Sequence, residues 1–274
     1  MSVHADFSRS RTIYGILKDH GHQDLSTLFD CYALTGGLPK HLELLAENKA
    51  LAKTAMLDFI LKPHSPFLAE GKSQLLEEFG RDYGTYFSIL ELIASGKTAR
   101  SEIEIHTGAY LARFENEYTL IGRHLPVTAK PGGRLQKYFI IDNFLDFWFR
   151  FINRNHSAVE TGNFGYLRQV IDRHYATWSG RLLERFFRDL LAATGRYNRI
   201  GSYWERGNRN EIDLVAVNDL DKRLLIAEIK RNKARISLTE LQAKAPRLLE
   251  AYRGYEVEYR GLSLEDAVEL LGGG

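Results

Sequence analysis

Three short apolar runs between residues 199 and 230 constrain the fold of this chain more than any other feature. They read RIGSYWE, EIDLVAV and RLLIAEIK, and polar residues separate them. Runs of this length and composition are typical of buried β-strands. A helix is predicted before them, over Val170–Leu191, in one piece or in two around Ser179-Gly180. A helix, a strand and a second helix are predicted after them, in LTELQAKAPRLLEAY, YEVEYRGLS and SLEDAVELL. Residues 170–274 are therefore predicted to form an α/β domain with a mixed central sheet.

The last of these apolar runs carries two charged residues, Glu228 and Lys230, two positions apart. Because side chains alternate along a strand, both are expected on the same face. Asp213 lies in the preceding run, and a turn over Asn218–Lys222 would bring Asp213 close to Lys230. Charged groups are costly to bury, so their presence in an apolar strand indicates a specific role.

Two carboxylates and a lysine in this arrangement suit the hydrolysis of phosphodiesters. The carboxylates can hold a hard divalent cation, typically Mg²⁺, with water completing its shell. The cation polarises a phosphoryl oxygen and lowers the pKa of a bound water, while the lysine orients that water or stabilises the transition state. The alternative interpretation is that Glu228 and Lys230 form an exposed ion pair on an edge strand.

Asp213 followed by Glu228-Ile229-Lys230 resembles the D-x(n)-E-x-K pattern of the PD-(D/E)xK nuclease superfamily, over roughly residues 170–262. The resemblance implies a restriction-endonuclease-like fold and metal-dependent cleavage of DNA or RNA. It implies that Asp213, Glu228 and the Ile229 backbone carbonyl are metal ligands, with Lys230 as the catalytic lysine. Because a fold does not determine an activity, an inactive nuclease-like domain is the alternative.

A fourth catalytic residue is implied by the same resemblance. In that superfamily, the helix before the first strand often supplies a glutamate, and WSGRLLERFFRDLL offers Glu184 in this position. Alternatively, Glu184 is a structural partner for a nearby arginine.

The N-terminal half is predicted to be mainly α-helical. Over residues 1–82, apolar residues recur at helical spacing, with a helix stop and a new start at Thr35–Pro39 and further helices over Lys49–Lys62 and Ser65–Gly80. Residues 83–141 give three helices, YGTYFSILELIASG, SEIEIHTG and LARFENEYTLIG, and then a hairpin in RHLPVTAKPGGRLQKYFIID. Three helices and a hairpin predict a winged helix, with the second and third helices as its helix-turn-helix pair.

Residues 142–169 form a predicted helical connector rich in aromatic residues. Phe144, Phe147, Trp148 and Phe151 fall at helical spacing in NFLDFWFRFINRN. Such stripes are usually core, so a buried seam joining two domains is predicted, with a base-stacking platform as the alternative.

Basic residues in two places could contact nucleic acid. The first group lies on the third helix and hairpin of the predicted winged helix and comprises Arg113, Arg123, Lys130, Arg134 and Lys137. However, Glu115 and Glu117 share that helix and would repel phosphate, so a winged helix that binds protein is an equal alternative. The second group, Arg231 and Lys233 beside the predicted site, would steer a polyanion or simply be a solvated strand end.

A second resemblance spans nearly the whole chain. LFDCYALTGGLPKHLELL is similar to the segment that opens the helical lid after the nucleotide-binding core of archaeal and bacterial AAA+/STAND-type ATPases. Those ATPases continue with a winged helix, a segment like FIIDNFLDFWFRFI and a domain of unknown function containing EID and ExK, in the order found here. The chain contains no P-loop pattern G-x-x-x-x-G-K-[ST], so neither ATP binding nor ATP hydrolysis is expected.

Bulk properties add few restrictions. The formal net charge of +2 does not by itself indicate a nucleic-acid-binding protein, and the single cysteine, Cys31, excludes an internal disulfide. No apolar run approaches the ~18 residues that span a bilayer, and a signal peptide is not evident, so a cytoplasmic protein without a membrane partner is predicted. The predicted function is a metal-dependent nuclease-like protein that acts on or binds DNA or RNA. The alternatives are a non-catalytic module for nucleic acid or protein, and a C-terminal fragment of a larger ATPase.

Overall fold

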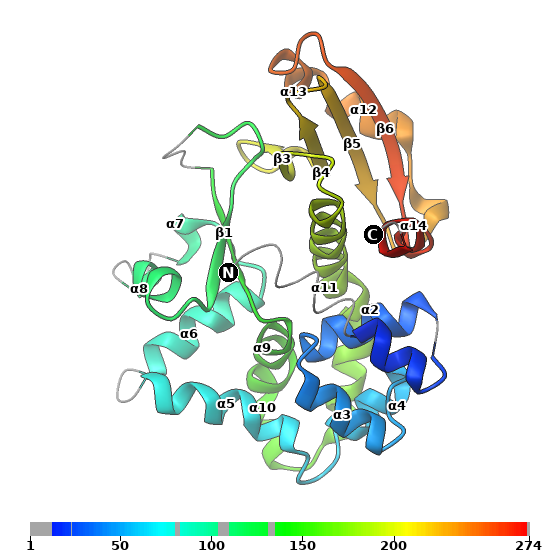
Figure 1. The fold of residues 1–274 in the computed structure, drawn as a ribbon. Coiled ribbons are helices and arrows are strands. Elements are labelled where there is room, and N and C mark those ends of the chain that lie inside the picture. The colour runs from blue at the N-terminus through cyan, green and yellow to red at the C-terminus, as the bar shows by residue number, and fades with distance from the viewer. Residues whose placement is uncertain (1–12, 23, 80–82, 104–109, 131–134, 273–274) are drawn as a thin grey trace. The chain divides into compact units, whose positions relative to one another are not determined.

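The computed structural model describes residues 13–22, 24–79, 83–103, 110–130 and 135–272 (Figure 1). The chain divides into two compact units, which are described separately. The helical unit comprises Thr12–Arg123 and Lys137–Trp178, and the sheet unit includes His124–Gln136 and Ser179–Gly274.

The helical unit begins with short helices whose ends follow local sequence signals. After a helical segment at residues 13–19, the helices are α2 (Leu25–Thr35), α3 (Pro39–Glu47), α4 (Lys53–Ile60), α5 (Pro66–Phe79) and α6 (Tyr83–Ala94). Asp24 caps α2 by accepting a hydrogen bond from the Thr27 N–H, and Gly36 ends that helix in the left-handed region at φ 64°. Pro39 occupies the first turn of α3, so the predicted stop and start at this point are confirmed.

Two further helices and a two-stranded sheet follow in the predicted order. They are α7 (Arg100–Ile103), α8 (Tyr110–Asn116), β1 (Ile121–His124) and β2 (Lys137–Ile140). The third helix was predicted to continue to Gly122, but it ends at Asn116 because Thr119 adopts a positive φ of 54° and Ile121 enters the strand. Gly122 leaves room for the ring of Phe139 on β2. Residues 104–109, in which the predicted second helix ends, lie outside the described ranges.

The aromatic connector is buried, as predicted, but it is not a regular α-helix. Helix α9 (Asn143–Phe147) continues into a π-helix (Trp148–Ile152), a 3₁₀ turn (Asn153–Asn155) and α10 (His156–Glu160). Phe144, Phe147, Trp148 and Phe151 are each at most 3% exposed. The rings therefore serve as core of the helical unit, and the interpretation as a base-stacking platform is wrong for these four residues.

Helix α11 (Phe164–Ala193) is continuous, so the predicted helix forms in one piece. Its residues up to Trp178 belong to the helical unit and those from Ser179 to the sheet unit. Glycine weakens a helix because its backbone loses more conformational freedom than that of other residues, yet Gly180 causes no break here.

The sheet unit contains a mixed four-stranded sheet, as predicted. Its strands β3 (Arg199–Glu205), β4 (Arg209–Asn218), β5 (Arg223–Ile229) and β6 (Glu256–Leu262) lie in that order. The first three strands are antiparallel, and β6 runs parallel to β5. Between β5 and β6 the chain forms a 3₁₀ turn (Lys233–Arg235), α12 (Leu238–Lys244) and α13 (Pro246–Glu250), and after β6 a 3₁₀ turn (Leu264–Asp266) and α14 (Ala267–Gly272).

The core of the sheet unit lies between the sheet and the helices α12 and α13. Alternate residues of β4 and β5, such as Val215 and Ile226, point to this core and meet Leu241 and Leu248 from the helices. This alternation is what the apolar runs in the sequence encode. Glu228 follows Ile226 on this face of β5, near the end of the strand, and Lys230 comes directly after the strand.

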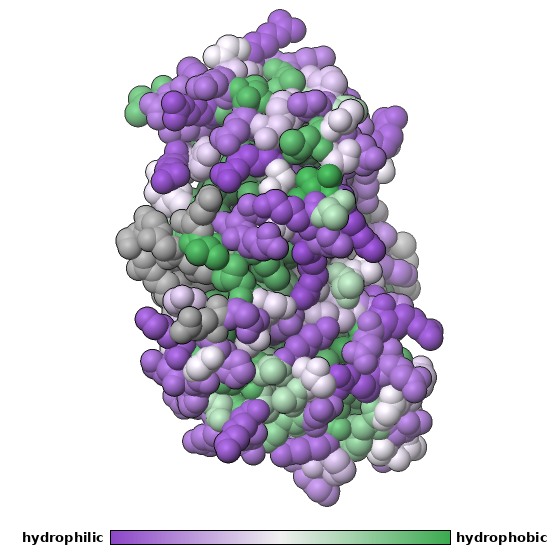
Figure 2. Space-filling model, turned by 90° about the vertical axis from the view of Figure 1, so that its right-hand side faces the viewer, coloured by the Kyte–Doolittle hydropathy of each residue, from purple (hydrophilic) through white to green (hydrophobic). Residues whose placement is uncertain are grey.

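No helix within the described ranges has an apolar stretch of the length needed to cross a lipid bilayer. On the face shown in Figure 2, hydrophilic side chains cover most of the surface, with smaller apolar patches between them.

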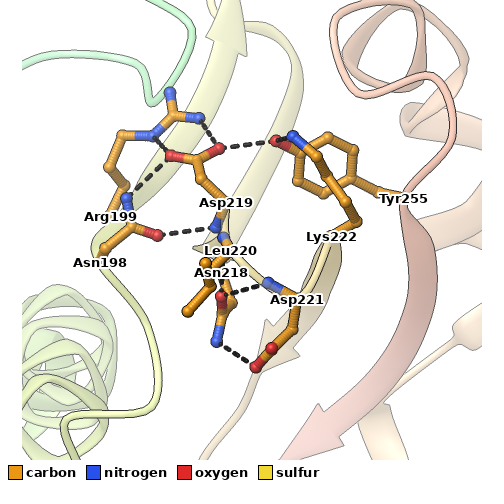
Figure 3. A network of polar contacts seen from close by, with 8 residues as sticks. All are labelled: Asn198, Arg199, Asn218, Asp219, Leu220, Asp221, Lys222 and Tyr255. Carbon is orange, nitrogen blue, oxygen red and sulfur yellow. Dashed lines mark hydrogen bonds and ion pairs between the residues drawn. The ribbon is translucent and has the colours of Figure 1, made fainter.

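The turn between β4 and β5 is held by a polar network around Asp219 (Figure 3). Arg199 binds both oxygens of the Asp219 carboxylate, at 2.8 and 3.0 Å. Asn198 donates to one of these oxygens at 2.8 Å, and the Tyr255 hydroxyl donates to the other at 2.6 Å. These donors, Arg199 first, hold the pKa of Asp219 well below its usual range.

We predict that Asp219→Asn lowers the thermal unfolding midpoint at pH 7 and that this difference shrinks below about pH 4. The folded protein binds a proton on Asp219 less readily than the unfolded chain, so the stabilisation is present above the unfolded pKa and is lost as the pH falls. Thermal unfolding of both proteins between pH 7 and pH 3 measures this. A difference that does not change with pH would contradict the prediction.

Candidate active site

A β-bulge places Asp213 at the edge of a strand ladder. Strand β3 pairs Gly201 with Val215 and Tyr203 with Ile212, so β4 has two residues between these pairs where β3 has one. A bulge of this kind interrupts the ladder and changes the direction of a side chain. It frees the Asp213 side chain to reach β5.

The Asp213 carboxylate binds the end of β5. Its Oδ2 atom accepts a hydrogen bond from the Ile229 N–H at 2.9 Å and lies 3.2 Å from the Lys230 ammonium nitrogen. The ladder between β4 and β5 ends at Leu214 and Ala227. Beyond it, the Asp213 side chain serves as the acceptor for the Ile229 N–H in place of a main-chain carbonyl. The structure thus brings Asp213 and Lys230 together, as expected from the sequence.

Glu228 is buried beside them. Its side chain lies on β5, which is flanked by β4 and β6, and Glu228 is only 6% exposed. Oε2 accepts a hydrogen bond from the Ser237 N–H at 3.0 Å, and Oε1 lies 3.3 Å from the Lys230 nitrogen. The alternative of an exposed ion pair on an edge strand is therefore wrong, because β5 is an interior strand and Glu228 is buried.

Lys230 bridges the two carboxylates. Desolvation lowers its pKa, but the charges and hydrogen bonds of Asp213 and Glu228 outweigh this effect and raise the pKa above the ordinary value. The lysine is therefore protonated at neutral pH. Two carboxylates share one ammonium group, which leaves one negative charge in excess within this trio.

Glu184 approaches the trio from α11. Although 30% of its side chain is exposed, desolvation by the surrounding protein and the charge of Asp213 raise the pKa of Glu184 to about 8. Arg188, one turn further along the helix, lies 3.9 Å from the Glu184 carboxylate and partly offsets this rise. The arginine partner expected for Glu184 is thus Arg188. Glu184 is also close enough to Asp213 for the charge of Asp213 to act on it.

Arg188 and Ser202 support Asp213 at the bulge, and neither was singled out from the sequence. The Ser202 hydroxyl donates to the Asp213 carbonyl at 2.9 Å. Arg188 donates to the Ser202 hydroxyl at 3.0 Å and to the same carbonyl at 3.5 Å. The only signal for Arg188 is its position four residues after Glu184, which places both on one face of the helix.

Ser237 is a third residue that the sequence reasoning missed. Its side chain caps α12 by accepting from the Glu240 N–H, and its own N–H binds Glu228. A serine three positions before a glutamate is a recognisable helix start, although its contact with Glu228 depends on the tertiary fold.

The residues predicted to bind nucleic acid are mostly engaged within the protein. Arg231 donates to the Ser179 hydroxyl at 2.9 Å, and Lys233 pairs with Asp266 at 3.2 Å. Arg113 pairs with Glu117, and Arg123 with Glu115. Lys130 is exposed and belongs to the sheet unit, Lys137 is half-buried and belongs to the helical unit, and Arg134 lies outside the described residues.

The donor set fits a divalent cation that keeps part of its water shell. In the part of the chain that the structure describes, no three His, Cys, Asp or Glu side chains gather closely enough to hold a metal ion by themselves. Mg²⁺ is commonly bound through one or two carboxylates and water, which Asp213 and Glu228 can supply. The Lys230 ammonium group, which is bound to both carboxylates, lies where such a cation would bind.

Comparison with known proteins gives two matches. Residues 148–244 match a family, DUF234, described as archaeal and bacterial proteins of unknown function. An uncharacterized protein of Methanocaldococcus jannaschii is 32% identical over 217 residues, which cover 74% of this chain and 47% of that protein. The chain thus spans about half the length of this curated relative. No solved structure matches the chain at a significant level.

We predict that Arg188→Met lowers the free energy of unfolding by about 1–3 kcal/mol, because it removes a partly buried donor from two acceptors at the bulge. Urea unfolding measures this loss. Arg181→Met, at an exposed position on the same helix, is the control and should change stability by less than about 0.5 kcal/mol. Equal losses in the two variants would show that the contacts of Arg188 add nothing.

Proposed function

We propose that this chain contains a metal-dependent nuclease-like domain that hydrolyses phosphodiester bonds in DNA or RNA. The observation that carries the proposal is that Lys230 bridges Asp213 and Glu228 where β5, an interior strand of the mixed sheet, ends. These are the residues of the D-x(n)-E-x-K pattern. The approach of Glu184, from the helix before the first strand of the sheet, supports the same assignment.

Each residue has a role in the proposed reaction. Asp213, Glu228 and the Ile229 carbonyl would hold the cation, which supplies positive charge to the phosphate and lowers the pKa of water. The Lys230 ammonium group would stabilise negative charge on the phosphoryl oxygens. Glu184, with its raised pKa, can hold a proton near neutral pH and exchange it with water or with a leaving oxygen. The Ile229 N–H keeps the Asp213 carboxylate in position.

The helices α6, α7 and α8 and the sheet of β1 and β2 are proposed to form a winged helix. The order of the elements supports this proposal. So does an antiparallel bridge between Ala99 and Lys137, which adds the segment before α7 to the sheet. Phosphate contacts by Arg113 and Arg123 would have to replace their ion pairs with Glu117 and Glu115. The same arrangement could serve a protein partner.

The wider context is also a proposal. The order of lid-like helices, winged-helix elements and the mixed sheet supports descent from the part of an AAA+/STAND-type ATPase that follows its nucleotide-binding core. The match covers 47% of the relative, and the rest of that protein leaves room for such a core. Without a P-loop in this chain, the nuclease-like site and not ATP would provide its chemistry.

We predict that the purified protein cleaves single- or double-stranded DNA or RNA with Mg²⁺ or Mn²⁺ and not with excess EDTA. Asp213→Asn, Glu228→Gln and Lys230→Met should each lower the rate at least about a hundredfold, since each removes a group that acts on the developing charge. Gel analysis of labelled substrates measures the rates, and circular dichroism confirms that the variants fold.

The matched control is Glu256→Gln, which removes a carboxylate of the same sheet at a position that is 79% exposed. This variant should cleave at the rate of the natural protein. Absence of metal-dependent cleavage on all four substrate types would contradict the nuclease proposal. Salt-sensitive binding without cleavage would then favour the non-catalytic module.

A further inference from the structure

Asp213 and Glu228 are held by the main chain, whereas Lys230, which bridges them, is not. One oxygen of Asp213 is fixed by the Ile229 N–H, and one oxygen of Glu228 by the Ser237 N–H. Both donors are main-chain groups at the end of β5 and at the start of α12, so the carboxylates are anchored independently of Lys230. Their remaining contact within the described residues is with the Lys230 ammonium group.

Lys230 is held far less firmly. It is 38% exposed, whereas the side chains of Asp213 and Glu228 are 16% and 7% exposed. Its ammonium group sits at the end of a flexible four-carbon chain, and among the described residues its partners are these two carboxylates. If another cation bound the carboxylates, the lysine could leave without disturbing the main chain, while the carboxylates would stay in place.

Charge balance favours such an exchange. One ammonium group faces two anchored carboxylates, and the excess negative charge is partly buried, where it is costly. A divalent cation would neutralise both carboxylates, which the lysine alone cannot do. The Lys230 nitrogen lies 3.2 Å from the Asp213 carboxylate and 3.3 Å from the Glu228 carboxylate. A divalent cation bound to both carboxylates would compete with this nitrogen for the same space.

We propose that Lys230 is the resting counter-ion of the site and that a divalent cation displaces it from Asp213 and Glu228. This inference rests on the proposed function, because it concerns the same cation. Loading of the site then has two effects at once: the cation takes the carboxylates, and the lysine becomes free to approach the phosphate. The lysine thereby sets the cation affinity of the site and keeps its own ammonium group unavailable until the cation binds.

The first test measures Mn²⁺ affinity by electron paramagnetic resonance, without any substrate. Lys230→Met removes the competing charge and keeps a side chain of similar length, so Mn²⁺ should bind at least about tenfold more tightly than to the natural protein. The matched control is Lys222→Met, which removes the same charge at the opposite end of β5, and its affinity should not change.

The second test uses the natural protein, so it does not depend on a variant that folds. Nuclear magnetic resonance of protein labelled at the lysine Nζ atoms gives the solvent exchange rate of each ammonium group. Addition of Mg²⁺ should speed the exchange of Lys230 severalfold, because its two carboxylate partners are taken. Lys233, which pairs with Asp266, is the internal control and should exchange at the same rate with and without Mg²⁺.

Each outcome decides between the two proposals. Tighter Mn²⁺ binding by Lys230→Met together with faster Lys230 exchange supports the displacement. If the natural protein binds Mn²⁺ and Lys230→Met binds it equally or more weakly, the displacement is overturned and the nuclease proposal stands. The same holds if Mg²⁺ does not alter the exchange rate of the Lys230 ammonium group. Absence of Mn²⁺ binding to all three proteins overturns both.

Discussion

The hydrogen bond from the Ile229 N–H to the Asp213 carboxylate is the contact on which the candidate site depends. It joins β4 to β5 beyond the last pair of their ladder, beside the point where β4 bulges against β3. A side chain that completes a sheet in this way cannot easily turn elsewhere, since the buried N–H would lose its partner. The position of the Asp213 carboxylate is therefore determined by the geometry of the sheet.

The other contacts of the site extend from this point. Glu228 is fixed by the start of α12, and Arg188 and Ser202 hold the carbonyl of the bulged residue. The carboxylates of Asp213 and Glu228 thus each accept a hydrogen bond from a main-chain N–H, whereas the ammonium group between them belongs to a flexible lysine. A rigid acidic pair with a mobile counter-charge suits a site that exchanges its cation, and this asymmetry underlies both proposals. A purely structural ion pair would not require a carboxylate excess.

The strands and the meeting of Asp213 with Lys230 could be predicted because they depend on short-range patterns. Apolar runs separated by polar turns define the strands, and the spacing of Glu228 and Lys230 defines their common face. The end of α8 could not be predicted, since the apolar periodicity continues past Asn116. The close packing of Trp148, the first residue of the π-helix, on the distant Gly71 of α5 could not be predicted either, because it depends on the tertiary fold. Arg188 and Ser202 were missed for the same reason, because their importance arises only from the bulge. The functional roles of all these residues remain predictions.

The most direct test of the central claim is the location of a bound cation. Crystals of the natural protein grown or soaked with Mn²⁺ would give an anomalous diffraction signal at each bound ion. The proposals predict a peak within about 2.0–2.3 Å of carboxylate oxygens from both Asp213 and Glu228, with the Lys230 nitrogen moved away from them. A site that binds no Mn²⁺, with Lys230 still bridging the two carboxylates, would contradict the account.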